Sequence, residues 1–143
     1  MPIKILVIDD DTAITELLSM LLKTHGFEVI TTNSGREGIQ LAMDETPNVV
    51  LLDLMMPDKD GWEVSKAVRK FSNVPIVILS AINDPSMIAS ILDAGADDYL
   101  IKPVPSAMLV AHIKKLMRRT TDSLKEFAGD SASFVSETHP LIS

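Results

Sequence analysis

The chain contains no cysteine, so it has neither a disulfide framework nor a thiolate metal site, as is typical of proteins in a reducing compartment. Aromatic residues make up only 4% of the sequence, so aliphatic side chains must supply the core. No apolar run approaches the roughly 20 residues that a membrane-spanning helix needs. We therefore expect a cytoplasmic protein that does not enter a membrane.

Basic residues are also few, with 13 Lys and Arg against 20 Asp and Glu, which gives a net charge of -7. Binding to nucleic acid phosphates needs a basic surface, so we expect no direct contact of this chain with nucleic acid. The 143 residues, 46% of them hydrophobic, suffice for one domain with a sizeable core.

Short aliphatic segments alternate with segments of helical period. The strands are expected at residues 3–8, 29–32, 49–52, 76–79 and 99–101. The first, third and fourth are apolar at nearly every position, as in strands that are covered on both faces. Five strands alternating with five helices predict a doubly wound, parallel α/β sheet with right-handed crossovers.

Helix starts are marked by capping residues. Asp11 is expected to cap the first helix, and Asp84 precedes Pro85 at the start of the fourth. Ser34 and Asp60 are each followed three positions later by glutamate, which is the spacing of a capping box. In the first helix we expect one buried stripe, formed by Ile14, Leu17, Leu18, Leu21 and Leu22.

The helical pattern of the last helix is expected over residues 106–117, after which it lapses. Residues 120–143 are rich in Ser and Thr. We therefore divide the chain into one domain, residues 1–119, and a tail or truncated linker, residues 120–143.

Polar side chains follow the predicted strands where each strand ends. Asp9 and Asp10 follow the first strand, Asp53 the third, Ser80 the fourth and Lys102 the fifth. Because the carboxyl ends of parallel strands meet at one edge of an open sheet, these residues are expected to gather around one small volume.

Three carboxylates in one place repel each other unless a cation intervenes. Mg²⁺, or Mn²⁺ in its place, accepts carboxylates and water as ligands, so Asp9, Asp10 and Asp53 predict a site for such an ion. A carboxylate at this position can attack phosphorus and form an acyl phosphate. The Lys102 ammonium and the Ser80 hydroxyl can share the charge of the transferring group.

Three stretches carry a resemblance to a known family: residues 5–11 (ILVIDDD), 51–61 (LLDLMMPDKDG) and 94–103 (AGADDYLIKP). They closely resemble the receiver domains of two-component response regulators, the CheY-like superfamily, in the same order and spacing over roughly residues 3–119. The resemblance implies a flavodoxin-like fold, with five parallel strands in the order 2-1-3-4-5.

The resemblance also implies a role for each site residue. Asp53 resembles the phosphoacceptor, and Lys102 the lysine that pairs with the phosphate. Ser80 resembles the switch hydroxyl and Tyr99 the switch aromatic. The implied metal ligands are the carboxylates of Asp9, Asp10 and Asp53 and the backbone carbonyl of Met55. The Lys102–Pro103 peptide bond resembles the cis bond of the family.

As a whole, the resemblance implies two-component phosphorelay signalling. A histidine kinase or phosphotransfer protein would donate the phosphoryl group to Asp53 in a Mg²⁺-dependent step, and the face of the fourth helix, fifth strand and fifth helix would change conformation. The protein would be a stoichiometric phosphoacceptor that catalyses its own phosphorylation and dephosphorylation, not a turnover enzyme. We expect a monomer or a weak, phosphorylation-dependent dimer.

Two alternatives remain at this point. Aspartyl-phosphate phosphatases also use a strand-end Asp with Mg²⁺, but they carry a second acid two positions later, where this chain has Met55. A degenerate receiver would act only as a protein-interaction module; such chains have usually lost part of the set, and here the acid pair, Asp53 and Lys102 are all present.

Overall fold

The computed structural model describes residues 2–128. The chain divides into two compact units, Met1–Val110 and Ala111–Ser143, and the first contains the whole sheet. No helix among the described residues has both the length and the hydropathy needed to cross a bilayer.

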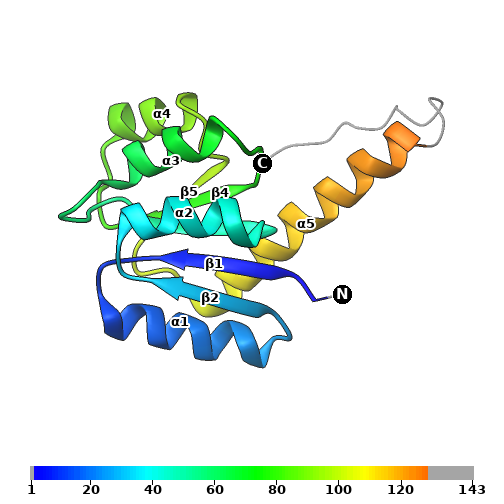
Figure 1. Ribbon diagram of the computed structural model, residues 1–143, viewed down its shortest axis with the longest axis horizontal. Helices are drawn as coiled ribbons and strands as arrows, with labels where there is room; N and C mark the ends of the chain where they lie inside the picture. Colours follow the sequence, from blue (N-terminus) through cyan, green and yellow to red (C-terminus); the bar gives the residue numbers. More distant parts are fainter. Residues whose placement is uncertain (1, 129–143) are drawn as a thin grey trace. The chain divides into compact units, whose positions relative to one another are not determined.

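Strands and helices alternate along the whole described chain, as the sequence predicts (Figure 1). In order they are β1 (Lys4–Ile8), α1 (Thr12–Thr24), β2 (Glu28–Thr32), α2 (Gly35–Glu45), β3 (Val49–Asp53), α3 (Gly61–Arg69), β4 (Ile76–Ser80), α4 (Pro85–Asp93), β5 (Asp98–Ile101) and α5 (Ser106–Ala128). All neighbouring strands pair in parallel, in the order β2-β1-β3-β4-β5. The predicted doubly wound, flavodoxin-like sheet of order 2-1-3-4-5 is therefore confirmed.

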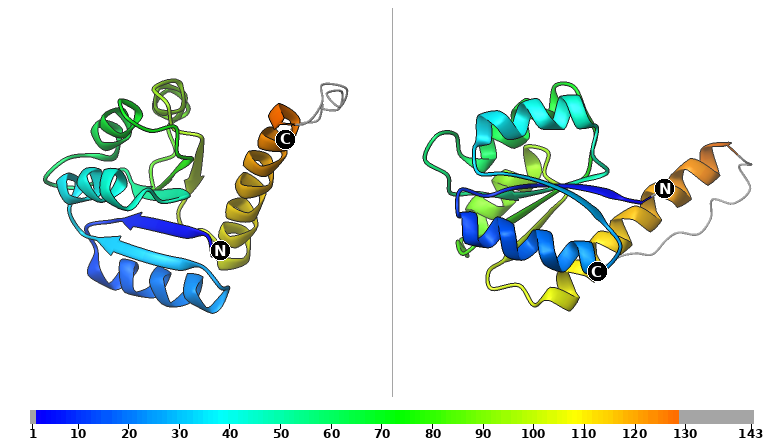
Figure 2. Two further views of the ribbon diagram at one scale, coloured as in Figure 1. Left: turned by 45° about the vertical axis from the view of Figure 1, so that its right-hand side comes forward. Right: turned by 60° about the horizontal axis from the view of Figure 1, so that its bottom comes forward.

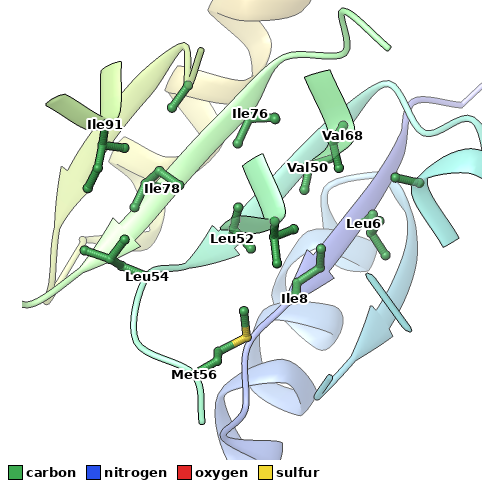
Figure 3. Close-up of a cluster of buried hydrophobic side chains, with 13 residues drawn as sticks. Leu6, Ile8, Val50, Leu52, Leu54, Met56, Val68, Ile76, Ile78 and Ile91 are labelled. Carbon is green, nitrogen blue, oxygen red and sulfur yellow. The ribbon is translucent and has the colours of Figure 1, made fainter. Parts of the chain in front are cut away.

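Helix α1 lies on one face of the sheet, and α2, α3 and α4 lie on the other (Figures 1 and 2). Every residue of β3 and β4 is buried, which explains why these strands lack a polar alternation. Alternate side chains of the three central strands point toward the second face and form a core with α3 and α4, in which Figure 3 labels Leu6, Ile8, Val50, Leu52, Ile76, Ile78, Val68 and Ile91. This core holds the ends of β1, β3 and β4 in fixed register.

The expected N-cap residues cap all four helices, and one of the two expected capping boxes is complete. The Asp11 side chain accepts the Ala13 and Ile14 N–H groups, and the Asp84 side chain accepts the Ser86 N–H. Asp60 forms the full capping box with the glutamate at the third position of α3.

At α2 the capping-box prediction is only half right. The Ser34 side chain accepts the Glu37 N–H, but the Glu37 carboxylate accepts the Thr32 hydroxyl in place of the Ser34 N–H. The Ser34 N–H is held instead by the Thr32 hydroxyl oxygen. The Thr32 hydroxyl at the end of β2 thus takes the place that the box assigns to the glutamate, and bonds that glutamate as well.

Two further expectations are corrected. Leu17, placed on the buried stripe of α1, is 61% exposed, because it lies about 140° around the helix from the buried Leu22. Helix α5, expected to end near Met117, continues to Ala128, so the boundary at residue 120 falls inside a helix. The rest of the expected tail, residues 129–143, lies outside the described residues.

Candidate functional site

The pairing of β1 with β3 brings the first acids of the site together. Ile8 is the register partner of Leu52, so Asp9 and Asp53 follow at neighbouring strand ends. One carboxylate oxygen each from Asp9, Asp10 and Asp53 lies within 4.8 Å of the others. The predicted acidic cluster therefore exists at the carboxyl edge of the sheet.

Lys102 reaches the same place from the end of β5. Its Nζ lies 3.2 Å from Asp9 Oδ2 and 3.5 Å from Asp53 Oδ1. The Lys102 N–H donates to the Ser80 carbonyl at 2.8 Å, which continues the β4–β5 ladder as far as the site. The Lys102–Pro103 bond is cis, in agreement with the expectation.

The environment of Asp53 disfavours its charge. Asp53 is 7% exposed and Asp9 only 3%, whereas Asp10 is exposed. Burial, and then the negative charge of Asp9, raise the pKa of the Asp53 carboxyl from 3.8 to about 6, and the Lys102 ammonium only partly opposes them. The lysine alone does not balance the acids.

This donor set fits a hard divalent cation. Every candidate ligand is an oxygen, and at neutral pH three carboxylates face one ammonium group. Met55 lies in the loop after β3, and its N–H contacts Asp53 Oδ1 at 3.4 Å. The Met55 carbonyl therefore belongs to the loop that directly follows Asp53, and its role as a metal ligand stays a prediction.

The two expected switch residues, Ser80 and Tyr99, both hydrogen-bond to the backbone of Ile82. The Ser80 hydroxyl, 1% exposed at the end of β4, accepts the Ile82 N–H at 3.1 Å. The half-buried Tyr99 donates its hydroxyl to the Ile82 carbonyl at 2.8 Å. Both side chains are thus joined to the backbone of the loop between β4 and α4.

Two residues near the site were missed by reasoning from the sequence. Asn33 donates to the Asp9 carbonyl, and Asp58 accepts hydrogen bonds from the start of α2. The short run of turn-forming residues at 57–61 indicated a structured loop, but no periodicity showed which segment it would contact.

The fold and the site define an open-sheet α/β protein with an acidic cluster at the carboxyl edge of the sheet. Residues 5–114 match the family model of the response regulator receiver domain. The chain therefore belongs to this family, and it is a receiver domain of two-component signalling.

Curated relatives support this assignment. A CpxR homolog of Haemophilus influenzae is 45% identical over 117 residues, covering 82% of this chain and 51% of the relative. Response regulator MprA of Mycolicibacterium vanbaalenii is 42% identical, covering 93% and 57%. A probable transcriptional regulator of Cyanophora paradoxa is 43% identical, covering 82% and 49%. The chain spans about half the length of these relatives.

Solved structures agree on the fold. The BeF3-activated receiver domain of Klebsiella pneumoniae RstA superposes with a TM-score of 0.77 at 31% identity, covering 80% of this chain and 98% of that one. A two-component response regulator from Clostridium difficile gives a TM-score of 0.80 at 32% identity, covering 82% and 98%.

Proposed function

We propose that this receiver domain accepts a phosphoryl group on the Asp53 carboxylate in a Mg²⁺-dependent reaction. The observation that carries the proposal is the convergence of Asp53 with Asp9, Asp10 and Lys102 at one edge of the sheet. A histidine kinase or a phosphotransfer protein is the proposed donor, in keeping with the receiver-domain family.

In the proposed step, an Asp53 oxygen forms a bond to phosphorus while the bond from phosphorus to the donor's imidazole nitrogen breaks. The nitrogen keeps the electron pair and takes up a proton. Asp53 must be ionised to attack, and its raised pKa of about 6 leaves it ionised at neutral pH. Lys102, already within 3.5 Å of Asp53, would follow the negative charge onto the phosphoryl oxygens.

The ion would be held by Asp9, Asp10, Asp53 and the Met55 carbonyl. When bound, Mg²⁺ offsets the carboxylate charges and polarises the phosphoryl oxygens. Mn²⁺ has similar ligand preferences and is expected to replace it.

The conformational response would begin at the Ile82 contacts. The Ser80 hydroxyl accepts the Ile82 N–H, and its own proton is available to a phosphoryl oxygen. Movement of Ser80 toward the phosphoryl group would stretch the Ile82 contact and loosen the loop that also holds the Tyr99 hydroxyl. Tyr99 would move toward the space beside Ser80. This shifts the equilibrium of α4, β5 and the start of α5 between two conformations.

A groove beside Lys102 supports docking of a protein donor near Asp53. It has a volume of about 480 Å³ and aliphatic walls that include Ile14, Leu17 and Leu18 of α1 and Val104 after β5. A histidine on a donor helix seated here would be presented next to the Lys102 end of the site.

Relatives named as transcriptional regulators suggest that the response controls transcription through an effector.

Acetyl phosphate with Mg²⁺ tests the proposal and separates it from the alternatives. The proposed function predicts one phosphate per chain, seen by intact-mass measurement, and none in Asp53→Asn. Rapid turnover without an adduct would identify a phosphatase, and neither adduct nor turnover would identify a degenerate receiver. Either of these results contradicts the proposal that the chain is a stoichiometric phosphoacceptor.

A further inference from the structure

The loop between β2 and α2 contacts both segments that carry the proposed metal ligands. We call residues 33–36, which comprise this loop and the first two residues of α2, the bridging loop. On one side, Asn33 Nδ2 donates to the Asp9 carbonyl at 2.8 Å and approaches Thr15 Oγ1 of α1 at 3.2 Å. The backbone that connects Asp9 to Asp10 is therefore held by a side chain from a different part of the sequence.

On its other side, the bridging loop receives the carboxylate of Asp58 from the loop between β3 and α3. Ser34 Oγ donates to Asp58 Oδ2 at 3.0 Å, and the Gly35 and Arg36 N–H groups donate at 3.2 and 3.3 Å. The Gly35 N–H, together with the other donors, holds the pKa of Asp58 below its usual value, so Asp58 stays ionised in this contact at neutral pH.

The contact between these two loops is close as well as polar. A Cβ atom on Gly35 would lie 2.8 Å from the Lys59 carbonyl oxygen, so only glycine allows this approach. At the other end of the β3–α3 loop, the Gly61 N–H donates to the Leu54 carbonyl at 2.8 Å. Met55 thus lies in a loop that is closed at its base and tied to α2 at its tip.

We infer that Asn33 and Asp58 are positioning residues for the Mg²⁺ site, and that the bridging loop fixes the separation of the two ligand-bearing loops. The inference rests on the proposed function. Neither residue is among the proposed ligands. Each instead limits the movement of a segment that carries one, and the ligand geometry Mg²⁺ requires is strict.

The test measures Mg²⁺ affinity separately from stability. Urea unfolding, followed by the fluorescence of Trp62, the only tryptophan of the chain, is repeated over a series of Mg²⁺ concentrations. The midpoint without Mg²⁺ gives the stability of the metal-free chain, and its rise with Mg²⁺ gives the dissociation constant. A residue with a purely structural role changes only the first quantity.

The variants are Asn33→Ala and Asp58→Asn, with Asp84→Asn as the matched control. Asp84 is also an exposed aspartate that accepts a hydrogen bond at a helix start, and within residues 2–128 its side chain hydrogen-bonds only to α4. We expect the Mg²⁺ dissociation constant to rise about three- to tenfold in the first two variants and to change less than about twofold in the control. The increase is expected to persist in 0.5 M KCl, which screens a long-range effect of the Asp58 charge.

Unchanged Mg²⁺ affinity in Asn33→Ala and Asp58→Asn would overturn the inference, even if both variants were less stable. So would an increase confined to Asp58→Asn that disappears in 0.5 M KCl. If Mg²⁺ binds the wild type and both variants with equal affinity, the proposed metal site stands and only the positioning role of the bridging loop fails. If the stability of the wild type does not respond to Mg²⁺, the proposed metal site fails, and the positioning role fails with it.

Discussion

The Asp53 carboxyl lies 3.5 Å from the Lys102 ammonium, yet its pKa is raised to about 6. Burial and the Asp9 charge outweigh the lysine, because withdrawal from water penalises the ionised carboxylate and a second acid adds to the penalty. At neutral pH the folded chain thus keeps a charge that its own residues do not fully offset. This excess of negative charge is what a divalent cation would balance.

The first residue-scale prediction concerns pH. Because the pKa of Asp53 is raised from 3.8 to about 6 on folding, its protonated form adds stability at low pH, and this contribution is lost as the pH rises through about 6. Without Mg²⁺, Asp53→Asn should therefore be more stable than the wild type at pH 8, by about 1–2 kcal/mol after allowance for solvent screening, and nearly equal to it at pH 4. Urea unfolding across this pH range measures the difference, and a difference independent of pH would contradict the assigned cause.

A second prediction concerns the lifetime of the phosphorylated form. Met55 is 61% exposed beside Asp53, and Ile82 lies two positions after Ser80. Neither side chain can hydrogen-bond a water molecule that approaches the phosphorus. We expect the double variant Met55→Asn, Ile82→Glu to lose its phosphoryl group several-fold faster. The decay of the phosphorylated mass after removal of acetyl phosphate measures this rate, and decay no faster than that of the wild type would refute the idea.

At the scale of the elements, the start of α3 lies directly against the end of β3. A Cβ atom on Gly61 would lie 2.6 Å from the Asp53 carbonyl oxygen and 2.8 Å from Leu54 Cα. Both atoms belong to the backbone, so neither can move without shifting the segment that carries Asp53. The helix start and the proposed phosphoryl site therefore constrain each other.

Gly61→Ala should accordingly lower the free energy of unfolding by about 1–3 kcal/mol and slow phosphorylation by acetyl phosphate. Gly38→Ala in α2 is the matched control, because the three atoms nearest to a Cβ atom there belong to the buried Ile8 side chain and none belongs to the backbone. We expect the control to keep the wild-type phosphorylation rate. Equal rates in the two variants would show that the contact with Asp53 is not needed for the reaction.

The strands and their ends could be predicted from the sequence, whereas the contacts between loops could not. The strands and the gathering of Asp9, Asp53 and Lys102 were predictable, since continuous aliphatic runs set the parallel sheet and parallel strands share one edge. The contacts of Asn33 and Asp58 were not predictable, because they depend on loop conformations that leave no periodic pattern. The helical periodicity also placed Leu17 on the buried face of α1, but the face that α1 buries is narrower than the apolar stripe and leaves Leu17 exposed.

At the scale of the whole molecule, exposed apolar groups flank the site. Leu17 is 61% exposed, and it lines the groove to which Lys102 also contributes. Exposed aliphatic side chains next to the proposed phosphoryl site are consistent with a protein donor that covers them during the proposed transfer. A small donor such as acetyl phosphate needs no such surface.

This difference gives a prediction about partners. Leu17→Asp should leave the stability and the acetyl phosphate reaction nearly unchanged. Transfer from a histidine kinase that phosphorylates the wild type should become slower by about tenfold or more. Radioactive phosphotransfer from the kinase, in parallel with the acetyl phosphate assay, makes the comparison. An equal effect on both donors would remove the groove from the proposed docking surface.

Asp53 is the residue proposed to carry the phosphoryl group, and borohydride reduction can identify the modified residue. Reduction of an acyl phosphate converts the aspartate into homoserine, which peptide mass spectrometry can assign to a position. After treatment with acetyl phosphate and Mg²⁺, we predict homoserine at position 53 alone, and none when EDTA replaces Mg²⁺. Homoserine at position 9 or 10, or labelling that persists in EDTA, would contradict the account.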